Sequence, residues 1–195
     1  MSYLIFAVLL IVASILSFIA FSQSKKSGKK TNIVKFQYFG EVDLNNPDEY
    51  YEQLVKIGDI EVSLDLNFEE TKVSTKSVEA TLSWLENLDK LVEIANQKIA
   101  IDFKVGHLVK EYINHQHSVF DKVELTSIGV DVTQDSISQK EMMFNALYLK
   151  RIGIYPEDNE RQFIFDYTVS NQLTDYILMV VFNCKGELVG MVEES

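Results

Sequence analysis

Three aspartates interrupt apolar stretches that are predicted to be β-strands: Asp65, Asp166 and Asp175. Aspartate is intrinsically disfavoured in strands, and neighbouring strands can bring such residues together on the polar face of one sheet. A carboxylate cluster of this kind can bind a divalent cation or take part in acid–base catalysis. Aspartate is also common at strand ends and on solvent-facing sheet surfaces. The pattern therefore allows a metal-dependent hydrolase, a binding surface or a purely structural role.

Four tyrosines lie close in sequence to these acids or to the same strands: Tyr50, Tyr51, Tyr167 and Tyr176. Tyrosine is enriched in protein–protein interfaces because its ring is apolar and its hydroxyl forms hydrogen bonds. Combined with the aspartates, the four side chains predict a protein-binding surface. The alternative is that their rings belong to the core and only the hydroxyls reach its rim.

The remaining reactive side chains do not form a recognisable site. His115 and His117 are two residues apart and point about 200° away from each other on a helix, whereas a dedicated metal pair is spaced i, i+4. Cys184 follows apolar residues without an adjacent base, as a reduced structural thiol would. The sequence contains no Gly-rich phosphate loop, no Gly-x-Ser-x-Gly motif and no Cys-x-x-Cys pair. We therefore predict no catalytic residue, no metal and no cofactor.

The elements that position these residues follow from the periodicity of the apolar side chains. Residues 60–68 alternate strictly between apolar and polar and, with residues 50–57, flank a hairpin turn at Gly58-Asp59. A long helix is expected after Ser74 or Thr75, because apolar residues recur at three- and four-residue spacing from Val78 to Ala95. Shorter helices are expected at 107–117 and from Ser138, where Ser138 and Glu141 match a capping box. Further strands are expected at 33–39, 148–155, 162–169, 173–182 and 187–192.

This order of elements predicts an α+β fold. We expect a mostly antiparallel sheet of about six to seven strands, with two to three helices on one face, preceded by a single transmembrane helix. The expected segments are a transmembrane helix at 1–22, a basic flexible linker at 23–32 and an acidic α+β domain at 33–195.

A set of short motifs occurs in an order that resembles a known bacterial family. The motifs are Phe39-Gly40-Glu41-Val42-Asp43, Tyr50-Tyr51, Leu64-Asp65-Leu66-Asn67-Phe68-Glu69, Arg151-Ile152-Gly153-Ile154-Tyr155-Pro156, Phe165-Asp166-Tyr167 and Leu173-Thr174-Asp175-Tyr176. Over residues 36–195 the chain resembles the small acidic proteins grouped as domain of unknown function 2004. The resemblance implies a soluble, cytosolic α+β domain and brings no activity or catalytic residues with it. The apolar N-terminal segment departs from that family's pattern.

That N-terminal segment is an uncharged apolar run from Tyr3 to Phe21, long enough for a helix of about 28 Å. A cluster of cations follows it: Lys25, Lys26, Lys29 and Lys30. A cleaved signal peptide is the alternative, but such peptides carry cations before the apolar run and have a shorter apolar core. By the positive-inside rule we expect a single-pass protein of the inner membrane whose C-terminal domain faces the cytoplasm.

Charge narrows the class of partner. The chain has 18 Lys and Arg, five of which precede residue 36, so 13 face 29 Asp and Glu from Phe36 onward, a balance of −16. Such a domain is repelled by nucleic acid. We therefore expect a protein-binding module whose partner presents a basic surface, in an immunity-like or adaptor role. The alternatives are a carboxylate-based metal-dependent hydrolase and a purely structural anchored domain.

Overall fold

A computed structural model describes residues 31–195, of which Ile33–Ser195 form one compact unit. The strands are β1 (Ile33–Phe36), β2 (Gly40–Asp43), β3 (Tyr50–Ile57), β4 (Ile60–Asn67), β5 (Tyr148–Ile154), β6 (Phe163–Thr168), β7 (Ile177–Phe182) and β8 (Leu188–Glu194). The helices are α2 (Thr75–Leu85), α3 (Leu88–Val105), α4 (Leu108–Val119), α5 (Lys122–Ser127) and α6 (Ser136–Asn145).

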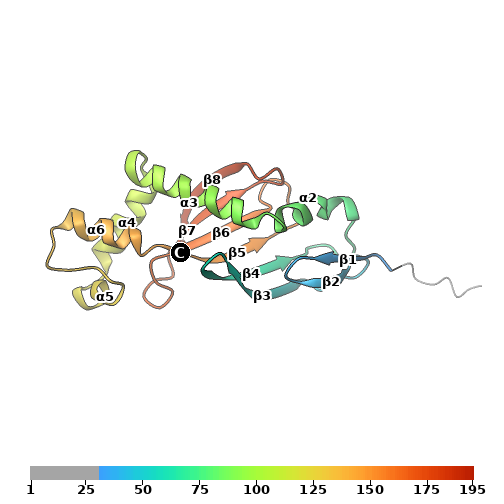
Figure 1. The fold of residues 1–195 in the computed structure, drawn as a ribbon, viewed down its shortest axis with the longest axis horizontal. Coiled ribbons are helices and arrows are strands. Elements are labelled where there is room, and N and C mark those ends of the chain that lie inside the picture. Colours follow the sequence, from blue (N-terminus) through green and yellow to red (C-terminus); the bar gives the residue numbers. More distant parts are fainter. Residues whose placement is uncertain (1–30) are drawn as a thin grey trace, which may run out of the picture. The chain divides into compact units, whose positions relative to one another are not determined.

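Six of the strands form one sheet in the order β3-β4-β5-β6-β7-β8, and β1 and β2 form a separate hairpin. Neighbouring strands of the large sheet are antiparallel except β4 and β5, which pair in parallel. A parallel pair requires a long crossover connection, and here all five described helices lie in the crossover between β4 and β5. Figure 1 shows α2 and α3 running along the sheet, with α4, α5 and α6 gathered toward one end.

The two faces of the sheet have different surroundings. Side chains alternate along a strand, and one set packs with α2 and α3 into the main core, including Leu64, Ile152, Phe165 and Val180, each 0% exposed. The opposite face carries a separate small cluster of Ile164, Met179 and Val181, with Tyr155 and Ile177 beside it. No described helix contributes a side chain to this second cluster. We call this side of the six-stranded sheet the open face.

The long helix expected after Ser74 is in fact two helices. Helix α2 ends at Leu85 and α3 begins at Leu88, with Asn87 between them. The Asn87 side chain donates a hydrogen bond to the carbonyl oxygen of Ser83 (3.0 Å). Asparagine side chains compete in this way with the regular helical hydrogen bonds, so the apolar periodicity continues while the backbone breaks.

Two further local predictions were wrong for reasons of capping and turn chemistry. Helix α6 begins at Ser136, because the Asp135 carboxylate accepts hydrogen bonds from the backbone N–H groups of Ile137 and Ser138, and the predicted cap at Ser138 lies inside the helix. Gly40 does not end the first strand. Strand β1 ends earlier, at Phe36, and Gly40, whose φ is 82°, is the first residue of β2 after the turn.

The predicted fold class needs correction. Residues 31–195 are α+β, but they hold eight strands in two sheets and five helices, where six to seven strands and two to three helices were expected. In this part of the chain no helix is long and apolar enough to cross a bilayer. The expected membrane span at 3–21, its flanking lysines at 25, 26, 29 and 30 and the location inferred from them lie outside the described residues. The described fold is therefore an α+β domain without a membrane-spanning helix.

Candidate functional site: an arginine between two buried aspartates

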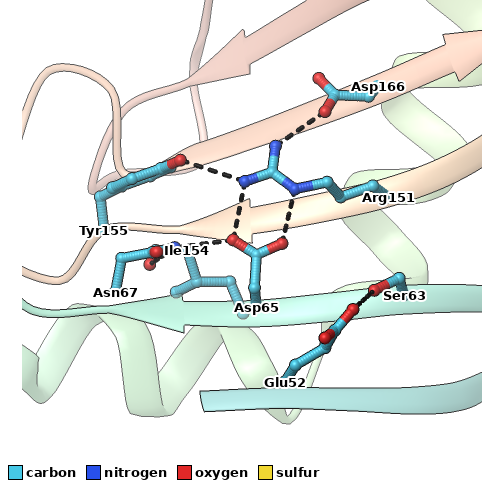
Figure 2. A network of polar contacts seen from close by, with 8 residues as sticks. All are labelled: Glu52, Ser63, Asp65, Asn67, Arg151, Ile154, Tyr155 and Asp166. Atoms are coloured by element: carbon cyan, nitrogen blue, oxygen red, sulfur yellow. Dashed lines mark hydrogen bonds and ion pairs between the residues drawn. The ribbon is translucent and has the colours of Figure 1, made fainter. Parts of the chain in front are cut away.

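The most concentrated polar cluster on the open face centres on Arg151 of β5. Parallel pairing aligns Ser63 of β4 with Arg151, and antiparallel pairing aligns Arg151 with Asp166 of β6. Asp65 lies two residues along β4 and on the same face, since side chains on a strand alternate. Figure 2 shows the guanidinium lying between the two carboxylates, with the helices behind the sheet.

The guanidinium uses three of its nitrogens to bind the two carboxylates. Nε donates to Asp65 Oδ1 at 2.6 Å, and Nη2 donates to Asp65 Oδ2 at 2.7 Å. Nη1 donates to Asp166 Oδ2 at 2.7 Å. Nη2 also contacts the Tyr155 hydroxyl at 3.2 Å. The bidentate contact with Asp65 has the planar fork geometry that arginine forms with carboxylates, and such charge-assisted hydrogen bonds are the strong ones.

Asp65 is fully buried and fully satisfied. It is 0% exposed, although it lies on the polar face of an alternating strand. Besides the two bonds from Arg151, its Oδ2 accepts a hydrogen bond from Asn67 Nδ2 at 2.7 Å, and the same amide lies 3.4 Å from the carbonyl oxygen of Ile154. A buried charge is tolerated when it is paired and hydrogen-bonded, and this pairing accounts for Asp65.

Asp166 is held less completely. It is 4% exposed, and its Oδ1 has no hydrogen-bond partner among the described residues. Burial raises the pKa of the Asp166 carboxyl, and although the hydrogen bond from Arg151 and its charge oppose this shift, the net direction is upward. The negative charges of Asp65 and Glu194 act in the same direction as burial. With all three groups ionised, the cluster carries one excess negative charge.

The guanidinium of Arg151 keeps its positive charge although it is partly buried. Burial lowers the pKa of its guanidinium, but the hydrogen bonds to Asp65, Asp166 and Tyr155 outweigh burial and raise that pKa above its ordinary value. Its side chain is 33% exposed. The cation therefore lies partly at the surface of the open face, above two carboxylates that are almost completely covered.

A glycine makes room for this arrangement. Gly153 pairs with Asp65 across the parallel β4–β5 ladder, and the Arg151 side chain lies over it. A Cβ at position 153 would meet Arg151 Nη2 at 2.9 Å and a ring carbon of Tyr155 at 3.0 Å. A glycine in a central strand weakens it unless something approaches the backbone closely, and here the guanidinium does so.

The structure brings together only two of the three predicted aspartates. Asp65 and Asp166 share Arg151, whereas Asp175 lies outside this network, exposed in the segment between β6 and β7. The expectation that all three cluster on one polar face is therefore not met by Asp175.

The four predicted tyrosines are dispersed. Tyr50 is 53% exposed on the open face, opposite Asn67, and its pKa is raised by burial and by the carboxylates of Asp65 and Glu52. The other three tyrosines have partners away from the aspartates. Tyr51 packs edge-on against Phe68 with a centroid separation of 6.1 Å.

Tyr167 and Tyr176 serve the packing of helices. Tyr167 is 3% exposed and donates a hydrogen bond from its hydroxyl to Asn96 Oδ1 of α3 (2.9 Å). Tyr176 packs edge-on against His115 at 4.6 Å, and its carbonyl oxygen accepts a hydrogen bond from Tyr112 at 3.2 Å. Of the four tyrosines, only Tyr50 accompanies the aspartates on the open face.

The two histidines named above have separate partners. His115 contacts Glu193 Oε1 at 2.9 Å, and His117 contacts Gln139 Oε1 at 3.0 Å. Within residues 31–195, no group of three or more His, Cys, Asp or Glu side chains is arranged to hold a metal ion.

This geometry weakens the metal-dependent hydrolase alternative. Both oxygens of Asp65 and one oxygen of Asp166 already accept hydrogen bonds from Arg151. Ca²⁺ takes six or more oxygen ligands, and Mg²⁺ takes an octahedral set. The guanidinium lies between the two carboxylates, where such an ion would have to bind. The cluster is therefore an ion-pair network on a sheet surface.

Sequence reasoning did not identify Arg151 as a site residue. The available signal was an arginine two residues before a glycine in an apolar strand, Arg151-Ile152-Gly153-Ile154. An arginine in such a strand requires an anionic partner, and the two aspartates that interrupt apolar strands were candidates for it.

Comparisons of this chain with protein families, with curated proteins and with solved structures found no match. The resemblance to domain of unknown function 2004 stays a prediction.

Proposed function

We propose that residues 33–195 form a protein-binding module that engages a basic surface of another protein through the open face of its six-stranded sheet. An adaptor, or an immunity-like inhibitor that masks a basic surface, would work in this way. The proposal is supported by the composition of the open face, by the charge of the domain and by the finding that no helix of residues 31–195 contributes to the apolar cluster on that face.

The observation that carries the proposal is the mixture of side chains on the open face. Strand register places Leu54, Ser63, Arg151, Asp166, Met179 and Val192 in one line across the six strands. At the two ends of this line Leu54 is 66% exposed and Val192 is 40% exposed. The same face carries the apolar cluster of Ile164, Met179 and Val181, and a surface that binds another protein combines apolar with polar groups.

Charge indicates the kind of partner. The exposed carboxylates of Glu52 and Glu61 lie on the same face, on β3 and β4, with one exposed cation, Lys56, opposite Glu61. The central network adds one excess negative charge, and Glu194 lies at the β8 edge. A basic partner surface would be complementary to this face, and such complementarity increases the association rate and excludes wrong partners.

The experiment compares two charge-reversed variants of the full chain with the wild type. Glu52→Lys with Glu61→Lys changes the open face, and Glu79→Lys with Glu93→Lys makes the same change in net charge on α2 and α3, where both glutamates are exposed. Each tagged protein is used to capture proteins from the cells that make it, and the captured proteins are quantified by mass spectrometry.

We expect at least one abundant protein with a basic surface to be retained by the wild type and by the helix variant and lost from the open-face variant. Retention should weaken as salt is added, because the contact is electrostatic in part. Equal capture by the two variants, or capture that depends on the helix glutamates, would contradict the proposal. Thermal unfolding of each variant checks that the domain remains folded.

A further inference from the structure

A second surface feature lies on the helices alone, away from the open face. Helices α3, α4 and α6 enclose a hollow of about 360 Å³. Its apolar lining comes from Phe103, Ile113 and Ile137, and three lysines, Lys104, Lys110 and Lys140, stand around it. The volume is at the lower end of the range for small-molecule sites.

The apolar floor of the hollow is built into the fold. Ile113 is 1% exposed and belongs to the main core. The Phe103 ring stacks on Phe144 of α6 with a centroid separation of 4.0 Å and an interplanar angle of 4°. Ile137, by contrast, is 73% exposed at the edge of the hollow. An apolar ligand that contacts Ile137 would remove this side chain from water.

The three lysines are unusual for this domain. From Phe36 onward only 13 Lys and Arg face 29 Asp and Glu, yet three of those cations surround one hollow whose lining includes a single carboxylate, Glu141. None of the three lysines forms an ion pair with a carboxylate of residues 31–195. Three cations without an internal counter-ion create a local positive potential on an acidic protein.

One of these cations is held in place. Lys110 Nζ donates a hydrogen bond to the carbonyl oxygen of Lys104 (2.9 Å), in the last turn of α3. An ammonium group has three donors, and this contact uses one of them. The ammonium group of Lys110 is therefore positioned at the rim with donors left for an anion.

We propose that this hollow binds a small amphiphilic carboxylate, with its apolar acyl stem against Phe103, Ile113 and Ile137 and its carboxylate among the three lysines. The apolar floor selects for a stem, which a bare inorganic anion lacks. The lysines select for an anionic head, which a neutral alcohol lacks. The ligand class follows from the combination of the two.

The test uses the full chain with octanoate as the probe, and with octanol and acetate as matched controls for the head and the stem. Isothermal titration calorimetry measures binding, and methyl NMR locates it. We expect octanoate to saturate one site, with shifts at the Ile113 and Ile137 methyl groups, and to bind at least tenfold more tightly than either control.

Two kinds of variant test the roles of the lining residues. Lys110→Gln with Lys140→Gln should reduce the affinity for octanoate by about fivefold or more, as expected for the loss of two partly exposed ion pairs. Lys56→Gln with Lys72→Gln, which change exposed lysines elsewhere, should leave it unchanged. Ile137→Asp places a charge at an exposed edge position and should abolish binding without unfolding the chain.

The proposal would be overturned if octanol bound as tightly as octanoate, if the Lys110 and Lys140 variant bound like the wild type, or if the NMR shifts lay outside α3, α4 and α6. Because the hollow is formed by helices, the open-face variant Glu52→Lys with Glu61→Lys should bind octanoate normally. Failure of this proposal and failure of the proposed protein-binding function are therefore distinguishable.

Discussion

Replacing Arg151 with methionine isolates the contribution of the cation at the centre of the open face. The substitution keeps an unbranched apolar stem but removes the donors to Asp65, at 2.6 and 2.7 Å, and to Asp166, at 2.7 Å. Two carboxylates with side chains 1% and 6% exposed are then left side by side without a counter-ion.

The expected cost is large for a single substitution. Removing one partner of a buried ion pair destabilises a protein by roughly 3–5 kcal/mol, because an uncompensated charge remains in the interior. The Arg151 side chain is 33% exposed, so water already reaches the guanidinium, and the lower end of that range applies. We predict a loss of about 3 kcal/mol in the free energy of unfolding at pH 7. A domain with a stability of about 5–15 kcal/mol would remain folded.

The loss should depend on pH in a defined direction. Without Arg151, burial and the negative charge of Asp65 hold the folded-state pKa of Asp166 above the unfolded value of about 3.9. Between the unfolded-state and folded-state pKa values, the native state binds more protons than the unfolded state. The free energy of unfolding of the variant therefore rises as the pH falls toward about 4. Urea unfolding followed by circular dichroism at pH 7 and pH 5 should show the deficit of the variant shrinking by about 1 kcal/mol or more.

A neutral version of the network provides the control. Asp65→Asn, Arg151→Met and Asp166→Asn together remove all three charges, and replacing a whole buried ion cluster is often close to neutral. We expect this triple variant to be more stable at pH 7 than Arg151→Met alone. A deficit for Arg151→Met below about 1 kcal/mol, or one of equal size at both pH values, would refute the reasoning that the cation neutralises buried charge.

Three further predictions concern single substitutions, each measured by urea unfolding. Asp166→Asn should lie within about 1 kcal/mol of the wild type at pH 7, since Arg151 keeps an oxygen acceptor. The pKa of Asp166 is raised in the folded protein, so wild-type stability falls as the pH rises above the unfolded-state pKa of about 3.9. The stability of Asp166→Asn relative to the wild type should therefore grow as the pH rises from about 4. A larger loss, or the opposite trend with pH, would contradict this. Gly153→Ala should cost about 1–3 kcal/mol, because its Cβ would lie 2.9 Å from Arg151 Nη2, and a neutral result would mean that the guanidinium moves aside freely. Asp121→Ala should cost about 1 kcal/mol by removing the cap of the six-residue helix α5, and no change would show that this cap is dispensable.

The sequence predicts those elements in which local pattern and tertiary environment agree. Residues 60–68 alternate strictly, and β4 spans Ile60–Asn67 with Val62, Leu64 and Leu66 in the core. The Gly58-Asp59 turn joins β3 and β4 as expected. On β4 one face packs apolar side chains into the core and the other face carries polar side chains, so the alternation in the sequence reports the strand directly.

The elements that were missed depend on hydrogen bonds that periodicity does not report. The break between α2 and α3 comes from the Asn87 side chain, and the start of α6 comes from Asp135. Helix α5 has only six residues, too few for a periodic signal, and its capping box at Asp121 and Glu124 defines it. The split into α2 and α3 and the short helix α5 bring the number of helices in the described residues to five, where two to three were expected.

The sequence predicted the two aspartates of the site but not Arg151, and the reason is the topology of the sheet. Asp65 and Asp166 were expected to meet on one sheet face, and they do so through Arg151. Contact between Asp65 and Arg151 depends on the parallel pairing of β4 with β5, which are separated in sequence by all the described helices. Local pattern carries no information about that pairing. Asp175 was included because a strand was expected at 173–182, but β7 begins only at Ile177.

Carboxylate footprinting of the captured complex tests the central claim, that the open face binds the partner, most directly. Carbodiimide-driven coupling of an amine modifies exposed carboxylates, and mass spectrometry compares each site in the free and bound protein. We predict that Glu52 and Glu61 of the open face react in the free protein and are protected in the complex, whereas Glu79 and Glu93 of the helices react equally in both. Protection of the helix glutamates with continued reaction of Glu52 and Glu61 would contradict the account.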